Sequence, residues 1–389
     1  METEKLYYAD PFLTDFTATV LDCQPGKNGY LVTLDRTAFY PEGGGQPADH
    51  GVLDGAVVTD VHEKNSVILH NVDRAVEIGK TVAGAIDWGR RFDHMQQHSG
   101  EHICSGLICE RFHCDNVGFH MGADIVTIDF NADISWEELL EIEAKANQYL
   151  YENHPIDIQF HRGAELEAID YRSKKALEGD VRIVAFPGAD CCACCGTHVL
   201  RSGQVGLVKF LSVQKFREGV RIELLCGKRA LEYLSRTWEQ AKAIGQRLSV
   251  KPVDSEAAVE RLEGELASLK LRCAQLEESV FESMAKEQAG KGNVLLFQPA
   301  MRPDSVRRLM DAVSKTCSGL AAVFSGEEGH YAYALGRADG QDISPLVKAM
   351  NTALHGRGGG RNGFAQGSVE TERSAIESFF KENGYGICD

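Results

Sequence analysis

The chain has 389 residues, of which 43% are hydrophobic and 25% are charged, and its formal net charge at pH 7 is −16. This length predicts two to four domains of ordinary globular composition. The negative charge excludes nonspecific nucleic-acid binding by the whole surface, so any such contact must use a local basic patch.

No stretch approaches the roughly 20 apolar residues that a membrane span needs. The first residues, METEKLYYADPF, lack the basic and apolar regions of a secretory signal. We therefore expect a cytoplasmic protein with no membrane partner. In that compartment the 12 cysteines are expected to be thiols or metal ligands and not disulfides.

Residues 1–90 alternate short apolar runs with turn residues, as in GYLVTLD and GVLDGAVVTDV. Such spacing is typical of short antiparallel strands joined by tight turns. The pattern predicts a small β-barrel or sandwich over this region.

The stretch TAFYPEGGGQP interrupts these strands. Its three consecutive glycines allow the backbone to adopt positive φ and to approach a ligand closely. A tight hairpin turn is the alternative interpretation. The polar residues around the glycines favour a binding loop, and they are Thr37, Glu42 and Gln46.

A helix with His98 and His102 follows, and their i, i+4 spacing puts both imidazoles on one face. His94 precedes His98 by the same spacing, so spacing alone leaves the metal pair ambiguous. The pattern Asp93-x-x-Gln96 resembles a capping box and predicts the start of the helix. Two histidines at this spacing more often lie on the polar face of a helix than bind a metal. Even as ligands they cannot complete a zinc shell, which needs four protein ligands or three and a water.

A second pair of candidate ligands lies in CCACCGTHVL, where Cys194 follows His102 by 92 residues and His198 follows Cys194 by four. The apolar run VRIVAFP predicts a buried strand that leads into this loop. Cysteine and histidine suit Zn²⁺ by their softness. The two pairs together predict a zinc site.

The rest of this region predicts an α+β core. IVTIDF reads as a strand, Ser135-x-x-Glu138 as the capping box of a second helix, and VGLVKFLSV with VRIELLCG as a hairpin. Residues 201–235 hold seven Lys or Arg against three acids, including Lys215 and Arg217 at the hairpin. A nucleic-acid contact and a solvated strand face both fit this excess of cations.

From Val259 to Val280 the apolar residues alternate three and four apart, which is a heptad seam. About 25 residues of helix span about 36 Å, so the seam fits a spacer or a dimer zipper. An intramolecular helical hairpin with residues 231–248 is the alternative, and the helical pattern of that stretch favours it.

Residues 292–389 alternate strands and helices and predict a small α/β module. Its unusual stretch is GRGGGRNGFAQG, which sets Arg357 and Arg361 among six glycines. Backbone N–H groups and guanidinium groups of such a loop can bind phosphate. A merely flexible loop is the alternative.

The motifs HSGEH, CCGTH and FYPEGGGQP, with the heptad helix and the Gly/Arg-rich loop, resemble the long-form AlaX proteins. These are free-standing relatives of the editing and C-terminal domains of alanyl-tRNA synthetase, and the resemblance covers nearly the whole chain. It implies that His94 is not a ligand. Cys195 stands where the family has a glycine, which bears on the loop conformation and on which thiolate binds. The implied zinc ligands are His98, His102, Cys194 and His198.

The resemblance implies zinc-dependent hydrolysis of tRNA(Ala) mischarged with serine, and also with glycine. Thr37 would form a hydrogen bond with the serine hydroxyl. It would thereby reject alanine, because bound alanine has no hydroxyl and would leave that of Thr37 without a partner. Gln46 would hold water or substrate. The implied substrate and tRNA contacts are Gly43, Gly44, Gly45, Lys215, Arg217, Arg357 and Arg361.

The expected architecture is multidomain α+β. It comprises a β-barrel domain (1–90), a zinc-binding editing domain (91–235), a helical coiled-coil linker (236–290) and a tRNA-binding C-terminal domain with a Gly-rich loop (291–389), with dimerisation through either of the last two. The non-enzyme alternative is a tRNA-binding protein with a structural zinc, and seryl-tRNA editing of the threonyl type is another. A zinc metalloprotease is a further, disfavoured alternative, because Ser99 follows His98 where His-Glu-x-x-His requires glutamate.

Overall fold

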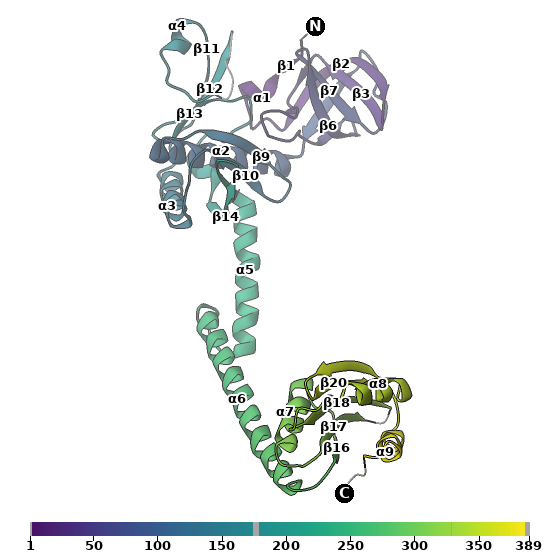
Figure 1. Ribbon diagram of the computed structural model, residues 1–389. Helices are drawn as coiled ribbons and strands as arrows, with labels where there is room; N and C mark the ends of the chain where they lie inside the picture. The colour runs from purple at the N-terminus through teal and green to yellow at the C-terminus, as the bar shows by residue number, and fades with distance from the viewer. Residues whose placement is uncertain (1, 174–178, 328, 386–389) are drawn as a thin grey trace. The chain divides into compact units, whose positions relative to one another are not determined.

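The computed structural model describes residues 2–173, 179–327 and 329–385, and the chain divides into two compact units, Met1–Ala243 and Ile244–Asp389 (Figure 1). The multidomain α+β organisation expected from the sequence is confirmed. The division falls inside helix α5 (Gly227–Leu248), and the finer four-part division stays a prediction. Among the helices that the structure describes, none combines the length and apolar character needed to cross a membrane.

The N-terminal strands close into an antiparallel barrel, drawn in purple and blue in Figure 1. Alternate residues of each strand point inward, as the strict alternation of buried and half-buried positions in Val67–Val72 shows. A short parallel pair, β1 (Glu4–Lys5) with β4 (Arg36–Thr37), and helix α1 (Leu6–Ala9) accompany it. The barrel order is β2 (Asp15–Gly26), β3 (Gly29–Leu34), β7 (Val67–Val72), β6 (Ala56–Lys64), β5 (Gly51–Leu53) and β8 (Thr81–Ile86).

Helix α2 (Trp88–Phe112) leads out of the barrel and is buried along most of its length. Its expected start at Asp93 is wrong. The side chain of Asp87 accepts the N–H of Arg90 and caps the helix, while Asp93 lies inside it and binds Arg229. The buried Arg91 pairs with Asp49 of the barrel region and so fixes the helix to it.

An antiparallel four-stranded sheet packs with α2 and α3 (Trp136–Glu152) around one apolar core. The capping box of Ser135 and Glu138 at the start of α3 is confirmed. The predicted hairpin is confirmed too, and Arg217 turns it with φ 54°. The sheet order is β14 (Val208–Phe216), β15 (Gly219–Cys226), β10 (Val126–Phe130) and β9 (Asn116–Met121).

A smaller sheet of β11 (Asp157–His161), β12 (Val181–Phe186) and β13 (Asp190–Ala193) carries the second pair of candidate ligands. The predicted strand β12 is almost wholly buried, and the loop after β13 contains Cys194 and His198. The short helix α4 (Ala164–Glu167) lies between β11 and β12 in sequence, and the 3-10 turn η1 (Ser202–Val205) follows β13.

The second unit contains a mixed five-stranded sheet that buries α7 (Pro303–Ser314) against β17 and β18. The Gly/Arg-rich segment that we expected to be a loop is instead a β-hairpin, because β19 pairs along its whole length with β20 and forms the sheet edge. The sheet order is β16 (Val294–Gln298), β17 (Leu320–Glu327), β18 (His330–Arg337), β20 (Phe364–Val369) and β19 (Arg357–Arg361), with helices α8 (Ser344–Ala353) and α9 (Arg373–Glu382).

The heptad segment lies in one helix, α6 (Ser255–Glu287), which follows the 3-10 turn η2 (Pro252–Asp254). Near its C-terminal end Phe281 and Ala285 are buried against the core beside α7. The seam itself is exposed, with Leu262 at 47% and Leu269 at 60%. The helix is as predicted, and its pairing in a coiled coil stays a prediction.

Candidate metal centre and substrate cavity

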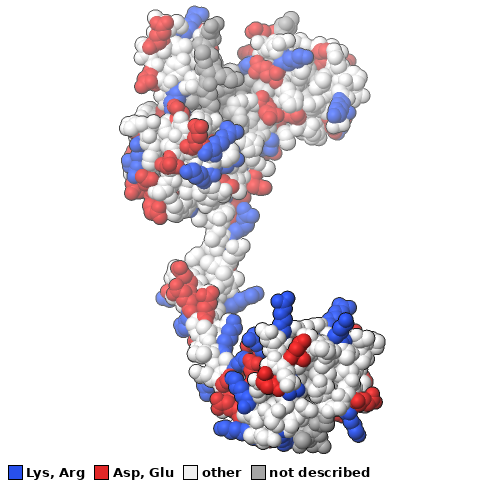
Figure 2. All heavy atoms as spheres, viewed as in Figure 1, with Lys and Arg blue, Asp and Glu red and all other residues white. Residues whose placement is uncertain are grey.

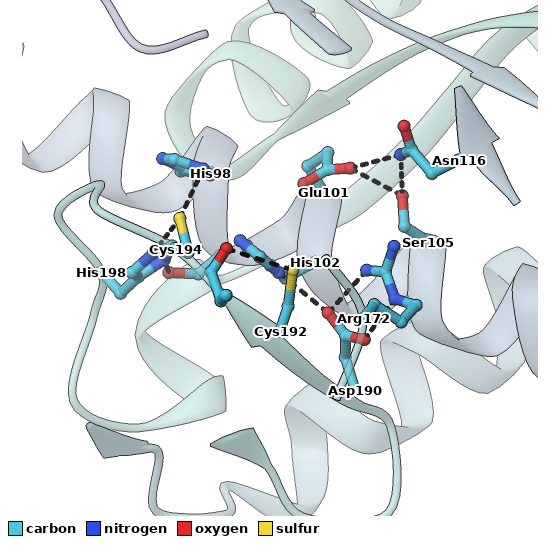
Figure 3. A network of polar contacts seen from close by, with 12 residues as sticks. His98, Glu101, His102, Ser105, Asn116, Arg172, Asp190, Cys192, Cys194 and His198 are labelled. Atoms are coloured by element: carbon cyan, nitrogen blue, oxygen red, sulfur yellow. Dashed lines mark hydrogen bonds and ion pairs between the residues drawn. The ribbon is translucent and has the colours of Figure 1, made fainter. Parts of the chain in front are cut away.

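Four buried side chains converge between α2 and the loop after β13 (Figure 3). Their ligand atoms all lie within 4.8 Å of one another. Cys194 Sγ is 3.5 Å from His98 Nε2 and 3.4 Å from His198 Nε2. The structure thus brings together the set that the sequence predicted: His98, His102, Cys194 and His198.

The spacing of these atoms fits zinc. In a tetrahedral site, Zn–S of about 2.3 Å and Zn–N of about 2.0–2.1 Å put sulfur and nitrogen about 3.5 Å apart. The separations from Cys194 match this value. Burial tends to raise the pKa of the Cys194 thiol, but the neighbouring histidines outweigh it and hold that pKa well below its usual value. The thiolate, which is the metal-binding form, is therefore favoured.

Each histidine of the quartet is oriented through its other ring nitrogen. His98 Nδ1 is 2.9 Å from Gln46 Oε1, and His102 Nδ1 is 2.8 Å from Asp190 Oδ2. His198 Nδ1 is 3.4 Å from the Ser99 hydroxyl. These partners leave each Nε2 for the centre, which is the arrangement that fixes metal-binding tautomers.

Among these three partners, Asp190 is the one with an ionisable side chain. Its buried carboxylate also accepts two hydrogen bonds of 2.7 Å from the Arg172 guanidinium. Burial tends to raise the pKa of Asp190, but His102 and Arg172 hold it below its usual value. Sequence reasoning missed both residues, because no spacing rule connects Arg172, Asp190 and a histidine on another element.

The glycine run forms a tight turn that delivers Gln46 to the metal centre. Gly43 and Gln46 exchange two backbone hydrogen bonds of 3.0–3.1 Å. Gly45 has φ +82°, and a Cβ there would lie 2.5 Å from the ring of Phe119. The buried Gln46 amide donates to Thr197 Oγ1 and its carbonyl accepts from Thr197 N–H, so the turn and the CCGTH loop are joined.

The CCGTH loop depends on Gly196, since a Cβ at that position would collide with the His98 ring. Cys194 Sγ, and not Cys195 Sγ, belongs to the quartet. Cys195 is exposed and lines the adjoining cavity. The presence of Cys195 where the family has a glycine therefore leaves the quartet intact.

Thr37 lies within the barrel region. It is fully buried, its hydroxyl is 2.9 Å from His70 Nε2, and it accepts the Phe39 N–H. Because His70 Nδ1 contacts the Val32 carbonyl, its Nε2 is the acceptor and Thr37 is the donor. Thr37 is absent from the described residues that line the cavity at the quartet.

That cavity has a volume of about 480 Å³ and is lined by His98, His102 and Cys194 together with Gly44, Gly45 and Glu101. Glu101 is 4% exposed, and its Oε1 accepts hydrogen bonds from Ser105 and Asn116 (Figure 3). Sequence reasoning missed Glu101, although it immediately precedes His102. Its burial is the informative feature, because carboxylates are rarely buried without a use.

The predicted RNA-binding cations do not line this cavity. Lys215 is exposed and lies 3.9 Å from Asp133, and Arg217 lies over the Phe216 ring. Arg357 and Arg361 are exposed on β19 of the second unit. On the face drawn in Figure 2, acidic and basic side chains are interspersed on both units.

Three segments match models of known families. Residues 3–90 match class II (A) tRNA synthetases, residues 181–223 match the second additional domain of threonyl and alanyl tRNA synthetases, and residues 290–382 match the DHHA1 domain. Both the barrel and the metal-binding loop thus fall in segments similar to synthetases.

Curated relatives match the chain almost from end to end. It is 30% identical to the alanyl-tRNA editing protein AlaX-L of Pyrococcus horikoshii, over 96% of each chain. It is 34% identical to the alanine–tRNA ligase of Natronomonas pharaonis, over 94% of this chain but 42% of that protein. The likeness to the editing protein covers nearly all of both chains, and this chain belongs to the AlaX-L family of alanyl-tRNA editing proteins.

Proposed function

We propose that this protein is a zinc-dependent aminoacyl-tRNA deacylase that hydrolyses seryl-tRNA(Ala), with glycyl-tRNA(Ala) as a second substrate. The observation that carries the proposal is the buried quartet in the wall of a 480 Å³ cavity. The donor set suits Zn²⁺, and a cavity of this size is in the range that takes small molecules. Membership of a family whose named relative is an alanyl-tRNA editing protein supports it.

His98, His102, Cys194 and His198 would hold the metal. When bound, zinc supplies Lewis-acid polarisation near the ester. The protein's own contribution is rigidity, because Gln46 fixes His98 and the Asp190–Arg172 pair fixes His102. An ester is already activated, so holding it beside a positioned water provides much of the required catalysis.

Glu101 is proposed to bind the α-ammonium group that every aminoacyl ester carries. Its Oε1 accepts both neutral donors, from Ser105 and Asn116, whereas no hydrogen bond to Oε2 is formed within the described part of the chain, and Glu101 lines the cavity. A buried carboxylate gains strongly from a cationic partner. Such a contact would orient serine, glycine and alanine alike and would give no discrimination among them.

Discrimination is proposed to come from Thr37 and the serine hydroxyl. The Thr37 hydroxyl donates to His70, so contact with a substrate would require that bond to be released. A site that must pair a polar group rejects a substrate lacking it, and alanine lacks the hydroxyl. Glycine would be accepted through size alone.

The closed four-ligand set favours one other candidate. Structural zinc sites have four protein ligands, whereas catalytic sites keep one position open. A noncatalytic tRNA-binding protein with structural zinc would need the same quartet. The family match to residues 181–223 names threonyl as well as alanyl synthetases, so seryl-tRNA(Thr) belongs among the substrates to be tested.

A deacylation assay with the zinc-loaded full chain separates these candidates. We expect release of serine from seryl-tRNA(Ala), little release of alanine from alanyl-tRNA(Ala), and loss of activity after chelation. Preference for seryl-tRNA(Thr) would favour editing of the threonyl type. Binding of tRNA(Ala) without release of any amino acid would refute the proposal and favour the noncatalytic candidate.

A further inference from the structure

A second cavity of about 480 Å³ lies in the first unit, between the N-terminal half of α2, the first turns of α5 and the turn after β9. It shares no lining residue with the cavity at the metal centre. The two are nevertheless neighbours in the fold. His94 of this cavity precedes His98 by one helical turn, and Pro47 follows Gln46.

His94 is the unusual member of this cavity. It is 2% exposed, and its Nδ1 has no hydrogen-bond partner among the residues that the structure describes. Most buried polar groups in folded proteins are paired, so an unpaired one requires an explanation. His94 is not part of the metal quartet, so metal binding does not supply that explanation.

The charges around His94 leave two guanidinium groups unmatched. Arg229 is neutralised by Asp93 at 2.6 Å, and Lys228 lies 3.6 Å from Glu232. The Arg90 guanidinium donates to the Ala48 carbonyl, which is neutral. Neither Arg90 nor Arg236 has an acidic partner within the described part of the chain, and the remaining acid at the cavity is the exposed Asp124.

We infer that this cavity binds a phosphate group of the RNA backbone, held by Arg90, Arg236 and the ring N–H of His94. Guanidinium groups match phosphate oxygens in geometry and charge. Burial and the nearby Arg90 and Arg229 lower the pKa of His94 to about 3, so the ring stays neutral and still offers one N–H donor.

The inference rests on the proposed function, because the substrate supplies the RNA. His94 lies four positions before His98 in the helix, which places the two about 6 Å apart along the helix axis. One strand could therefore present its terminal ester at the quartet and a phosphate of a preceding nucleotide at His94. A chain with a net charge of −16 needs such local contacts to hold RNA.

The experiment measures binding of uncharged tRNA(Ala) to the full-length protein by fluorescence anisotropy at several salt concentrations. The double variant Arg90→Gln/Arg236→Gln should bind about tenfold or more weakly, and its salt slope should fall by about one, as for one lost phosphate contact. Lys27→Gln is the matched control, because Lys27 is an exposed cation in the β2–β3 turn without a described partner. Uncharged tRNA makes the result independent of hydrolysis, which seryl-tRNA(Ala) tests separately.

His94→Phe distinguishes recognition from structure. The substitution keeps a ring of similar size and removes the unpaired nitrogen, so the free protein should melt at the same temperature or higher while tRNA binding weakens. A melting temperature that falls together with unchanged tRNA affinity would refute a role for His94 in binding. If the Arg90/Arg236 double variant matched Lys27→Gln in affinity and salt slope, the inference would be wrong. It would also be wrong if inorganic phosphate stabilised the wild type and not the double variant while both bound tRNA(Ala) equally well, since the ligand would then be free phosphate.

Discussion

The chain has two runs of three glycines, one in each unit, and they have different structures. Gly43–Gly45 forms a turn in which Gly44 and Gly45 have φ of +59° and +82°. Gly358–Gly360 forms part of the extended edge strand β19, where Gly360 packs its backbone against Phe364 of β20. The first run directs Gln46 onto His98, whereas the second presents a flat backbone with Arg357 and Arg361 at its ends. The same run of three glycines thus positions a side chain at the candidate metal centre in one unit and forms an exposed edge strand in the other.

The largest expected effect comes from removing the centre beside the first run. His98→Ala combined with Cys194→Ala should abolish zinc binding, because two protein ligands cannot hold the metal tightly. Hydrolysis should be lost with it, while affinity for tRNA through the second unit should persist. Metal analysis and tRNA binding measure the two effects. Unchanged zinc content in the double variant would show that the metal is held elsewhere.

The next effect concerns the support of the centre. Asp190→Asn should weaken zinc affinity about 10- to 100-fold, as outer partners of metal-binding histidines commonly do. Competition with a chelator measures this. Glu152→Gln is a matched control, because Glu152 also pairs with a histidine, His154 at 2.7 Å, away from the quartet. Equal zinc affinities for the two variants would mean that His102 needs no anchoring.

The candidate metal ligands could be predicted from the sequence, whereas the residues that position them could not. His98 and His102 follow a helical period, and Cys194 and His198 stand in one loop, so local spacing identifies them. Asp190 and Arg172 reach the centre through tertiary packing, which no local period records. Glu101 lies beside His102 on the same helix, but the burial that singles it out is itself a product of tertiary packing. The strands and helices with clear apolar periods were predicted for the same reason.

The two errors have a physical cause as well. The sequence does not indicate the true start of α2, because Gly89 and the charged pair after it conceal the Asp87 cap. The sequence predicts a loop for the Gly/Arg-rich segment because glycine lacks strand propensity. Pairing of β19 with β20 along all five residues overrides that propensity, and Asn362 and Gly363 provide the positive φ of the turn.

The division of labour between the two units can be tested by truncation after Ala243, where the first unit ends. Hydrolysis of a seryl-charged minimal acceptor stem should persist, because the quartet and its cavity lie wholly in this unit. Affinity for full-length tRNA(Ala) should fall about tenfold, since the glycines and arginines of β19 are lost. Full-length Arg357→Gln/Arg361→Gln should reproduce part of that loss. A truncated protein that keeps zinc but hydrolyses nothing would contradict the division.

The glycine comparison itself is tested by one alanine in each run. Gly45→Ala should destabilise the first unit and slow hydrolysis, because a positive φ costs roughly 1–2 kcal/mol for alanine and the Cβ meets Phe119. Gly359→Ala should change stability by less than about 0.5 kcal/mol, because its Cβ would point into open space. Thermal melting measures both. Equal shifts of the melting temperature in the two variants would contradict the proposed difference between the glycine turn and the glycine strand.

The smallest effect expected on hydrolysis concerns Thr37, which lies six residues before the first glycine run. Thr37→Val is nearly isosteric and removes the hydroxyl that donates to His70. Loss of one hydrogen bond is worth roughly 0.5–1.5 kcal/mol, so hydrolysis of seryl-tRNA(Ala) should slow about threefold to tenfold. Zinc content should stay the same, and glycyl-tRNA(Ala) should show no comparable loss, because glycine has no hydroxyl to bind.

The ratio of the two rates therefore decides the role of Thr37. The variant leaves the buried His70 Nε2 without a partner whichever substrate is present, so a purely structural role would lower the melting temperature and slow both reactions equally. A loss confined to the seryl substrate would mean that the Thr37 hydroxyl leaves His70 when serine binds. His70→Phe provides the complementary measurement: with its acceptor removed, the Thr37 hydroxyl is available, and the preference for serine over glycine should increase if Thr37 senses serine.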